Sequence, residues 1–213
     1  MFYPFNQLVR VLPGFLPLLP LMAAYHLIVA SKYKGKKEKN AAAHIAAVYV
    51  FCFTLVFILN ATGIPAIQHF TSGADIKFAL LDSSRTSLRH YTLNALLFIP
   101  VGLLLPMLWK RFEKWPATLL CGFLFSLSIE IIQLFSDSRI TDVDDLLMNT
   151  VGTLIGFIIA VIIKKLLPKI EVFSVDNAIC WKWESRLCFC FAWISMLFFR
   201  HFAAKLLFGA ARP

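Results

Sequence analysis

Six long apolar runs dominate the sequence and limit what the chain can fold into. Each of the first five has about the 20 residues that a helix requires to cross a membrane. Arg200 and Lys205 interrupt the sixth run, so it either spans the membrane with these side chains reaching the interface or crosses only in part. The runs cover residues 12–30, 41–59, 91–109, 116–135, 146–163 and the stretch from 187 onward. The pattern predicts an all-α fold, a polytopic membrane helix bundle with five to six transmembrane helices.

The composition supports a membrane protein and excludes several other classes. Of the 213 residues, 59% are hydrophobic and 15% are charged, against about 45–50% and about 25% in soluble domains. The net charge is +9, but the basic residues form local clusters and no continuous stripe, so no nucleic-acid partner is expected. The five cysteines lack the spacing of a zinc site. We therefore expect neither a metal nor a cofactor.

The distribution of Lys and Arg predicts the orientation of the helices. Most of the 21 basic residues lie in segments 32–39, 110–114 and 164–186, and the side richer in Lys and Arg is expected to be cytoplasmic. Both chain ends and the acidic segment 136–145 then face outward. Pro17 and Pro20 predict a kinked or irregular first span. Segment 76–91 is interpreted as a surface helix with Arg85 and Arg89 one turn apart.

Polar residues gather near the outer ends of the third, fourth and fifth runs. Glu130 lies within an apolar run, where a carboxylate is costly and indicates a functional role. Asp142, Asp145 and Asn149 share one helix face by their spacing, and Asn94 lies at a comparable depth. We call the predicted set the polar notch and expect it to bind a ligand; its members are Asn94, Glu130, Gln133, Arg139, Asp142, Asp145 and Asn149. Below it, Gly152 and Gly156 form a GxxxG pattern that permits close helix packing.

Structural explanations exist for most of these residues. Asp142, Asp144 and Asp145 are also what a helix N-terminus prefers. Asn94, Gln133 and Asn149 can equally join helices by hydrogen bonds worth about 1 kcal/mol each. Glu130 is harder to explain in this way, because the apolar runs contain no other acid in their interiors.

The same residues carry a resemblance to the VanZ-like membrane protein family, which is named for a protein linked to teicoplanin resistance. Three blocks match in order and spacing: NALLFIPVGLLL at 94–105, EIIQ at 130–133 and RITDVDDLLMNTVGTLIG at 139–156. The resemblance implies a multi-pass protein of the bacterial plasma membrane. In some members it implies reduced sensitivity to glycopeptide or lipoglycopeptide antibiotics, but it supplies no agreed reaction.

With this resemblance, the chain divides into three expected parts. Residues 1–60 form two transmembrane helices with a basic cytoplasmic loop. Residues 61–170 form a VanZ-like core with an extracytoplasmic loop and three transmembrane helices. Residues 171–213 form an interfacial segment and a C-terminal hydrophobic helix.

Three hypotheses for function remain open. In the first, the polar notch binds or handles a membrane lipid or a lipid-linked cell-envelope precursor, with Arg85 and Arg89 contacting its phosphate. In the second, the acids serve an intramembrane hydrolase or transferase, with or without a metal; no Ser/His/Asp set supports it, and the enzyme assignment stays open. In the third, the chain is a structural or regulatory partner of other membrane proteins. The oligomeric state is left open.

Overall fold

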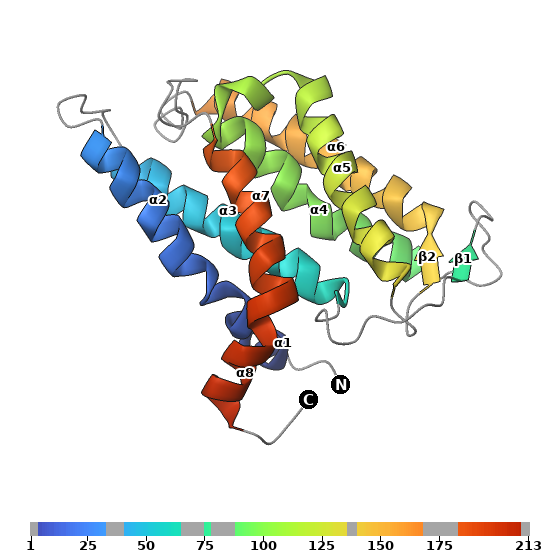
Figure 1. The fold of residues 1–213 in the computed structure, drawn as a ribbon. Coiled ribbons are helices and arrows are strands. Elements are labelled where there is room, and N and C mark those ends of the chain that lie inside the picture. The colour runs from blue at the N-terminus through green and yellow to red at the C-terminus, as the bar shows by residue number, and fades with distance from the viewer. Residues whose placement is uncertain are drawn as a thin grey trace. The chain divides into compact units, whose positions relative to one another are not determined.

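The structure is a computed structural model, and its helices are shown in Figure 1. It describes residues 4–32, 41–64, 75–77, 88–135, 140–167 and 183–209. The chain forms two compact units, which are described separately. The first comprises Met1–Glu38, Val48–His69 and Ala178–Pro213, and the second comprises Lys39–Ala47 and Phe70–Asn177. The division into residues 1–60, 61–170 and 171–213 that we expected from the sequence stays a prediction.

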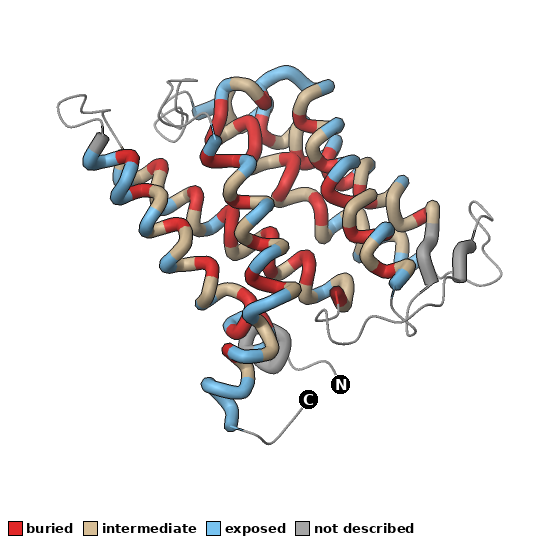
Figure 2. Tube along the Cα trace, viewed as in Figure 1, coloured by how far each residue is buried: buried red, intermediate tan, exposed pale blue. Residues whose placement is uncertain are grey.

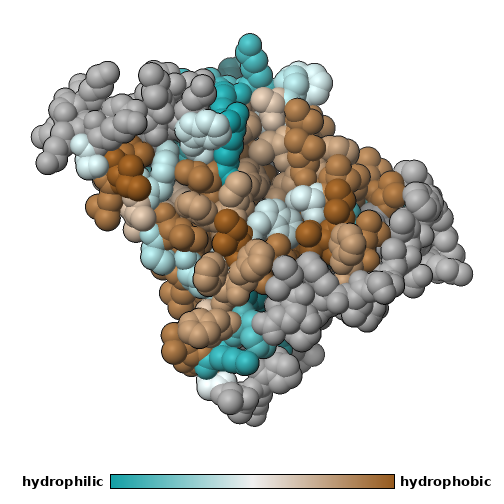
Figure 3. Space-filling view, viewed as in Figure 1, coloured by the Kyte–Doolittle hydropathy of each residue, from teal (hydrophilic) through white to brown (hydrophobic). Residues whose placement is uncertain are grey.

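Five helices are long and apolar enough to cross a membrane within the described part of the chain. They are α3 (Ala41–Ala61), α4 (Leu88–Leu108), α5 (Trp115–Gln133), α6 (Val143–Leu166) and the continuous helical stretch Glu184–Phe208. Large apolar side chains such as Leu27, Leu120 and Ile158 remain exposed on these units, and hydrophobic surface covers much of the visible face (Figure 3). Because such surface is unfavourable in water, the predicted all-α, multi-pass membrane bundle is confirmed.

The first apolar run does not form one continuous helix. It is divided between α1 (Pro4–Phe15) and the shorter α2 (Leu18–Lys32), with a turn at Leu16 and Pro17. Pro17 has no backbone N–H and its ring clashes with the preceding turn, so the helix breaks at this point. The irregularity was therefore expected, but the run is not the single span of residues 12–30 that its length suggested.

The first unit also contains the last helical stretch of the chain. Here α7 (Glu184–Ile194) continues through a π-helical turn, Ser195–Phe199, into α8 (Arg200–Phe208). The Ser195 hydroxyl donates to the carbonyl oxygen of Gly14 in α1. A Cβ at Gly14 would lie 2.5 Å from Met196 Sδ. The absence of a side chain at Gly14 therefore allows α1 to pack against the π-helical turn.

A buried hydrogen bond joins α2 to α7 within this unit. The distance between His26 Nε2 and Glu184 Oε1 is 2.9 Å, and the Glu184 side chain is fully buried. Buried polar groups are costly unless they are hydrogen-bonded. This pair therefore fixes the register between the two helices.

The helix α3 ends at a glycine. Gly63 has a φ of 70°, and the amide of Ile64 donates to the Leu59 carbonyl at 3.0 Å. This is the hydrogen-bond pattern of a Schellman motif, which needs a left-handed residue that glycine adopts without strain. Arg200 then donates to the Ile64 carbonyl oxygen at 3.0 Å, so α8 is attached to the end of α3.

The second unit is organised around α4, α5 and α6, whose buried residues line their shared interface (Figure 2). Close contacts pair Ala95 with Gly152 and Ile99 with Gly156; because both numbers rise together, α4 and α6 run in the same direction. The helix α5 runs in the opposite direction, as expected when helices that follow one another in the chain each cross the membrane. It begins with Pro116 in its first turn, where the missing N–H costs no hydrogen bond.

Two short strands in this unit differ from the expectation. The strand β1 (Asp75–Lys77) pairs in parallel with β2 (Ile140–Asp142). Segment 76–91 is therefore not one surface helix: its start belongs to β1, residues 78–87 lie outside the described part, and Leu88 already begins α4. Backbone pairing between two distant loops overrides the local helical pattern here, because each strand satisfies the other's amide groups. The helix α6 likewise begins at Val143, earlier than the apolar run predicts.

Candidate functional site

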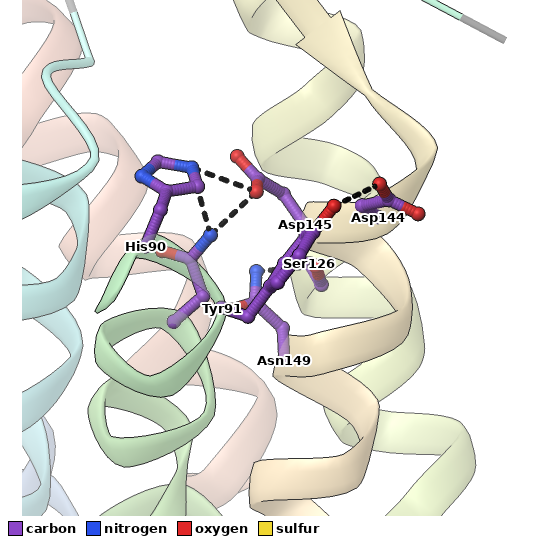
Figure 4. A network of polar contacts seen from close by, with 7 residues as sticks. His90, Tyr91, Ser126, Asp144, Asp145 and Asn149 are labelled. Atoms are coloured by element: carbon purple, nitrogen blue, oxygen red, sulfur yellow. Dashed lines mark hydrogen bonds and ion pairs between the residues drawn. The ribbon is translucent and has the colours of Figure 1, made fainter. Parts of the chain in front are cut away.

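Five polar residues meet where the first turns of α4 and α6 lie side by side, and we call them the α4–α6 polar cluster. Its members are His90, Tyr91, Asn94, Asp144 and Asp145. Asn94 Nδ2 donates to Asp145 Oδ1 at 2.5 Å, and His90 Nε2 lies 3.0 Å from the same oxygen. Figure 4 shows the His90 and Asp145 side chains facing each other across the gap between the two helices. One carboxylate oxygen therefore contacts two side chains of α4.

The neighbouring carboxylate is held in a different way. The Tyr91 hydroxyl donates to Asp144 Oδ2 at 2.8 Å (Figure 4), and Asp144 is fully buried. Burying a carboxylate is unfavourable unless hydrogen bonds compensate for the lost water. Tyr91 and Asp144 therefore form the closed part of the cluster.

The cluster is open on the side of His90 and Asp145. The His90 side chain is 50% exposed and that of Asp145 is 21% exposed, whereas Asp144 is inaccessible. A ligand that approaches the ends of α4 and α6 thus meets an imidazole and a carboxylate that are already held by Asn94. The imidazole and the carboxylate together offer this ligand both a hydrogen-bond donor and hydrogen-bond acceptors at one position.

A second polar contact lies deeper between α5 and α6. Asn149 Nδ2 donates to Ser126 Oγ at 2.9 Å, and both residues are buried. Asn149 lies six residues after the start of α6, which is about 9 Å along the helix axis. Its Oδ1 atom is buried and has no hydrogen-bond partner among the described residues. The deeper contact therefore leaves one acceptor of the amide unused.

Glu130 and Gln133 extend the same face of α5 toward the cluster. Both are buried, with exposed fractions of 5% and 6%. Gly122 packs on Thr153 and Ser126 contacts Asn149, so each turn of α5 corresponds to one turn of α6 in the opposite direction. The next turn places Glu130 at the level of Asp145. Glu130 therefore points into the protein and not into lipid.

The predicted packing glycines lie directly on the backbone of α4. A Cβ at Gly152 would fall 2.0 Å from the Ala95 carbonyl oxygen, and one at Gly156 would fall 2.1 Å from that of Ile99. A Cβ at Gly102 of α4 would likewise fall 1.9 Å from the Thr153 carbonyl oxygen. These contacts bring α4 and α6 close enough for short side chains at their ends to meet.

Several members of the predicted polar notch are thus brought into one region of the second unit: Asn94 and Asp145 touch, and Glu130, Gln133 and Asn149 are buried on the facing helices. Asp142 is the last residue of β2, and its side chain is not described. Arg85 and Arg139 lie outside the described residues, whereas Arg89 is exposed in the first turn of α4. Among the described side chains, no three acids, histidines or cysteines are arranged to hold a metal ion.

The predicted polar notch did not include four residues that take part in these contacts: His90, Tyr91, Ser126 and Asp144. The signal for two of them was present. His90 precedes Asn94 by four residues, and Ser126 precedes Glu130 by four, so each pair shares a helix face. Asp144 and Tyr91 gave no such signal, because their pairing depends on how α4 and α6 are aligned.

The fold and this region define a multi-pass helical membrane protein with a polar cluster at one end of three packed helices. The chain belongs to the VanZ/LLP1 family, whose model matches residues 18–164. The matched segment contains α2 to α5 and nearly all of α6, and so includes every residue of the α4–α6 polar cluster. No curated protein and no solved structure matches the chain at a significant level.

Proposed function

We propose that the α4–α6 polar cluster binds the headgroup of a membrane lipid or of a lipid-linked cell-envelope precursor. The observation that carries the proposal is the contact of Asn94 and His90 with one oxygen of Asp145 at a partly exposed position. This arrangement holds a carboxylate ready for an incoming amine or hydroxyl group. Preorganised polar groups bind more tightly than mobile ones, because less entropy is lost on binding.

The surroundings of the cluster favour a lipid over a soluble ligand. The helices that present it expose large apolar side chains, among them Leu93, Leu96 and Leu147. A ligand that reaches Asp145 therefore passes apolar surface, which suits a molecule with a hydrocarbon tail. Arg89 adds a positive charge in the first turn of α4, and a headgroup phosphate would be attracted to it.

In the cell, we place this site in the outer leaflet of a bacterial plasma membrane. Binding a lipid or precursor there would change what a surface-acting glycopeptide or lipoglycopeptide antibiotic encounters. The proposal therefore includes an effect on susceptibility to these compounds.

The test is to identify the lipids that remain with the purified full-length chain by native mass spectrometry. Asp145→Asn keeps the side-chain volume but removes the charge, so we expect the retained headgroup species to fall by roughly tenfold, which equals 1.4 kcal/mol of binding. Glu113→Gln is the matched control, because it removes one acid from a surface pair with Lys164 at the other end of α6. Equal retention by all three proteins would contradict the proposal.

The contact between His90 and Asp145 also favours a second candidate function. An imidazole hydrogen-bonded to a carboxylate is the arrangement of a general base, as in hydrolases and transferases. In that case the purified protein would cleave or transfer a lipid headgroup, and His90→Gln would abolish product formation while leaving lipid retention in place. Loss of retention without any product would favour the binding role.

A further inference from the structure

A groove in the first unit lies between the break of the first apolar run and α8. It has a volume of about 420 Å³ and is lined by apolar side chains alone. Leu16, Pro17 and Pro20 form one wall, and Phe199, Phe202 and Leu206 form the other. The groove exists because Pro17 ends α1, so that no continuous helix fills this space.

Positive charge collects beside this groove. Arg200 follows Phe199 directly, and Arg10 lies on α1, which packs against α8, so that its charge acts on that of Arg200. The chain also places Lys205 on α8, where it is exposed. Two guanidinium groups held near each other are stabilised when an anion lies between them.

No acid compensates this charge in the described part of the first unit. Its one acidic residue there is Glu184, which lies sixteen residues before Arg200, about 24 Å along the helical stretch. Glu184 is moreover hydrogen-bonded to His26. Among the described residues of this unit, no carboxylate is therefore placed to compensate the two arginines, and an anion from another molecule can do so.

The π-helical turn Ser195–Phe199 gives the groove its fixed shape. One additional residue per turn in such a segment changes the direction of the side chains that follow it. The Ser195 bond to Gly14 and the Arg200 bond to the Ile64 carbonyl fix this turn on both sides. The apolar wall and Arg200 are thus held together by the same turn.

We infer that this groove holds an acyl chain of an anionic phospholipid whose phosphate lies beside Arg10 and Arg200. An apolar groove alone accepts any lipid tail, and the uncompensated arginines select a negatively charged headgroup. This site is separate from the α4–α6 polar cluster, because it is formed by residues of the first unit.

The test uses the full-length chain in nanodiscs of phosphatidylcholine that contain a minor fraction of phosphatidylglycerol. After extraction, retained lipids are counted by native mass spectrometry. We expect phosphatidylglycerol to be retained in preference to phosphatidylcholine. Arg10→Gln should lower its retention roughly tenfold, the loss of one charge-assisted contact. Arg10 is chosen over Arg200 because the Arg200 guanidinium also stabilises the end of α3.

Three comparisons make the result decisive. Arg186→Gln removes a positive charge near the start of α7 and should leave phosphatidylglycerol retention unchanged. Ala203→Phe should reduce retention by filling the groove. Excess inorganic phosphate should not displace the lipid. Equal retention of the two phospholipids, an equal effect of Arg186→Gln, an unaffected Ala203→Phe variant or displacement by phosphate would each overturn the inference.

Discussion

Gly152 of α6 lies against the carbonyl oxygen of Ala95 in α4, so closely that an added Cβ would stand 2.0 Å from that oxygen. Backbone atoms cannot move aside as a flexible side chain can. The helices would have to separate, and the contacts at the ends of α4 and α6 depend on their closeness. This one glycine therefore connects the packing of the second unit with its polar cluster.

Gly152→Ala is expected to destabilise the protein by about 1–3 kcal/mol, as overpacking does in other proteins. This loss should occur although alanine favours helices more than glycine does. Thermal unfolding in detergent measures it. Gly14→Ala is the comparison, since its Cβ would meet side-chain atoms of Met196 and Val56 and not backbone atoms; it should cost less. A Gly152→Ala protein as stable as the wild type would contradict the packing described here.

The buried contact between Ser126 and Asn149 should be measurable as a coupling energy. Hydrogen bonds between membrane helices contribute about 0.6 kcal/mol on average and up to about 1.7 kcal/mol. We expect a double-mutant cycle with Ser126→Ala and Asn149→Ala to give a value in this range. Additive effects of the two substitutions would show that the two side chains do not interact.

Tyr91→Phe removes the hydroxyl that donates to buried Asp144. Hydrogen bonds to charged groups contribute about 1.5–3 kcal/mol, and we expect a loss of stability near the lower end because α6 can still shield the acid. Tyr49→Phe serves as the comparison, because it makes the same chemical change in α3 of the first unit. A loss of stability of similar size in both variants would mean that the hydrogen bond from Tyr91 to Asp144 contributes no stability of its own.

The pair of His26 and Glu184 should behave as a unit. His26→Leu deprives a fully buried carboxyl group of its imidazole partner, at a cost of about 1–3 kcal/mol. The double variant with Glu184→Leu should regain part of this stability, because two apolar side chains leave no polar group behind. Thermal unfolding of the two proteins tests the prediction, and a double variant less stable than His26→Leu would refute it.

The extent of the spans could be predicted from the sequence because hydrophobicity and chain length determine them. The helices α3 to α6 begin and end within a few residues of the apolar runs. The break at Pro17 followed from proline chemistry. The pairing of β1 with β2 could not be foreseen, because it depends on two loops distant in the chain.

The residues of the site likewise divide into those that the sequence predicts and those that it does not. Asn94, Glu130 and Asn149 are conspicuous because polar side chains are rare in apolar runs. Their partners are not: Tyr91 and Asp144 meet through the alignment of α4 with α6, which the glycine contacts set. A pattern along one helix reveals which face is polar, whereas the identity of the contacts requires the relative position of two helices.

The parallel arrangement of α4 and α6 has an electrostatic consequence. Their peptide dipoles point the same way, so their positive ends lie next to each other and repel. Asp144 and Asp145 stand at these ends, and Lys164 and Lys165 stand at the negative end of α6. The acids and the lysines each offset the partial charge at their own end of α6. The two acids also offset the positive end of the neighbouring helix α4. Neutralising Asp145 would therefore leave the two positive helix ends with less opposing charge.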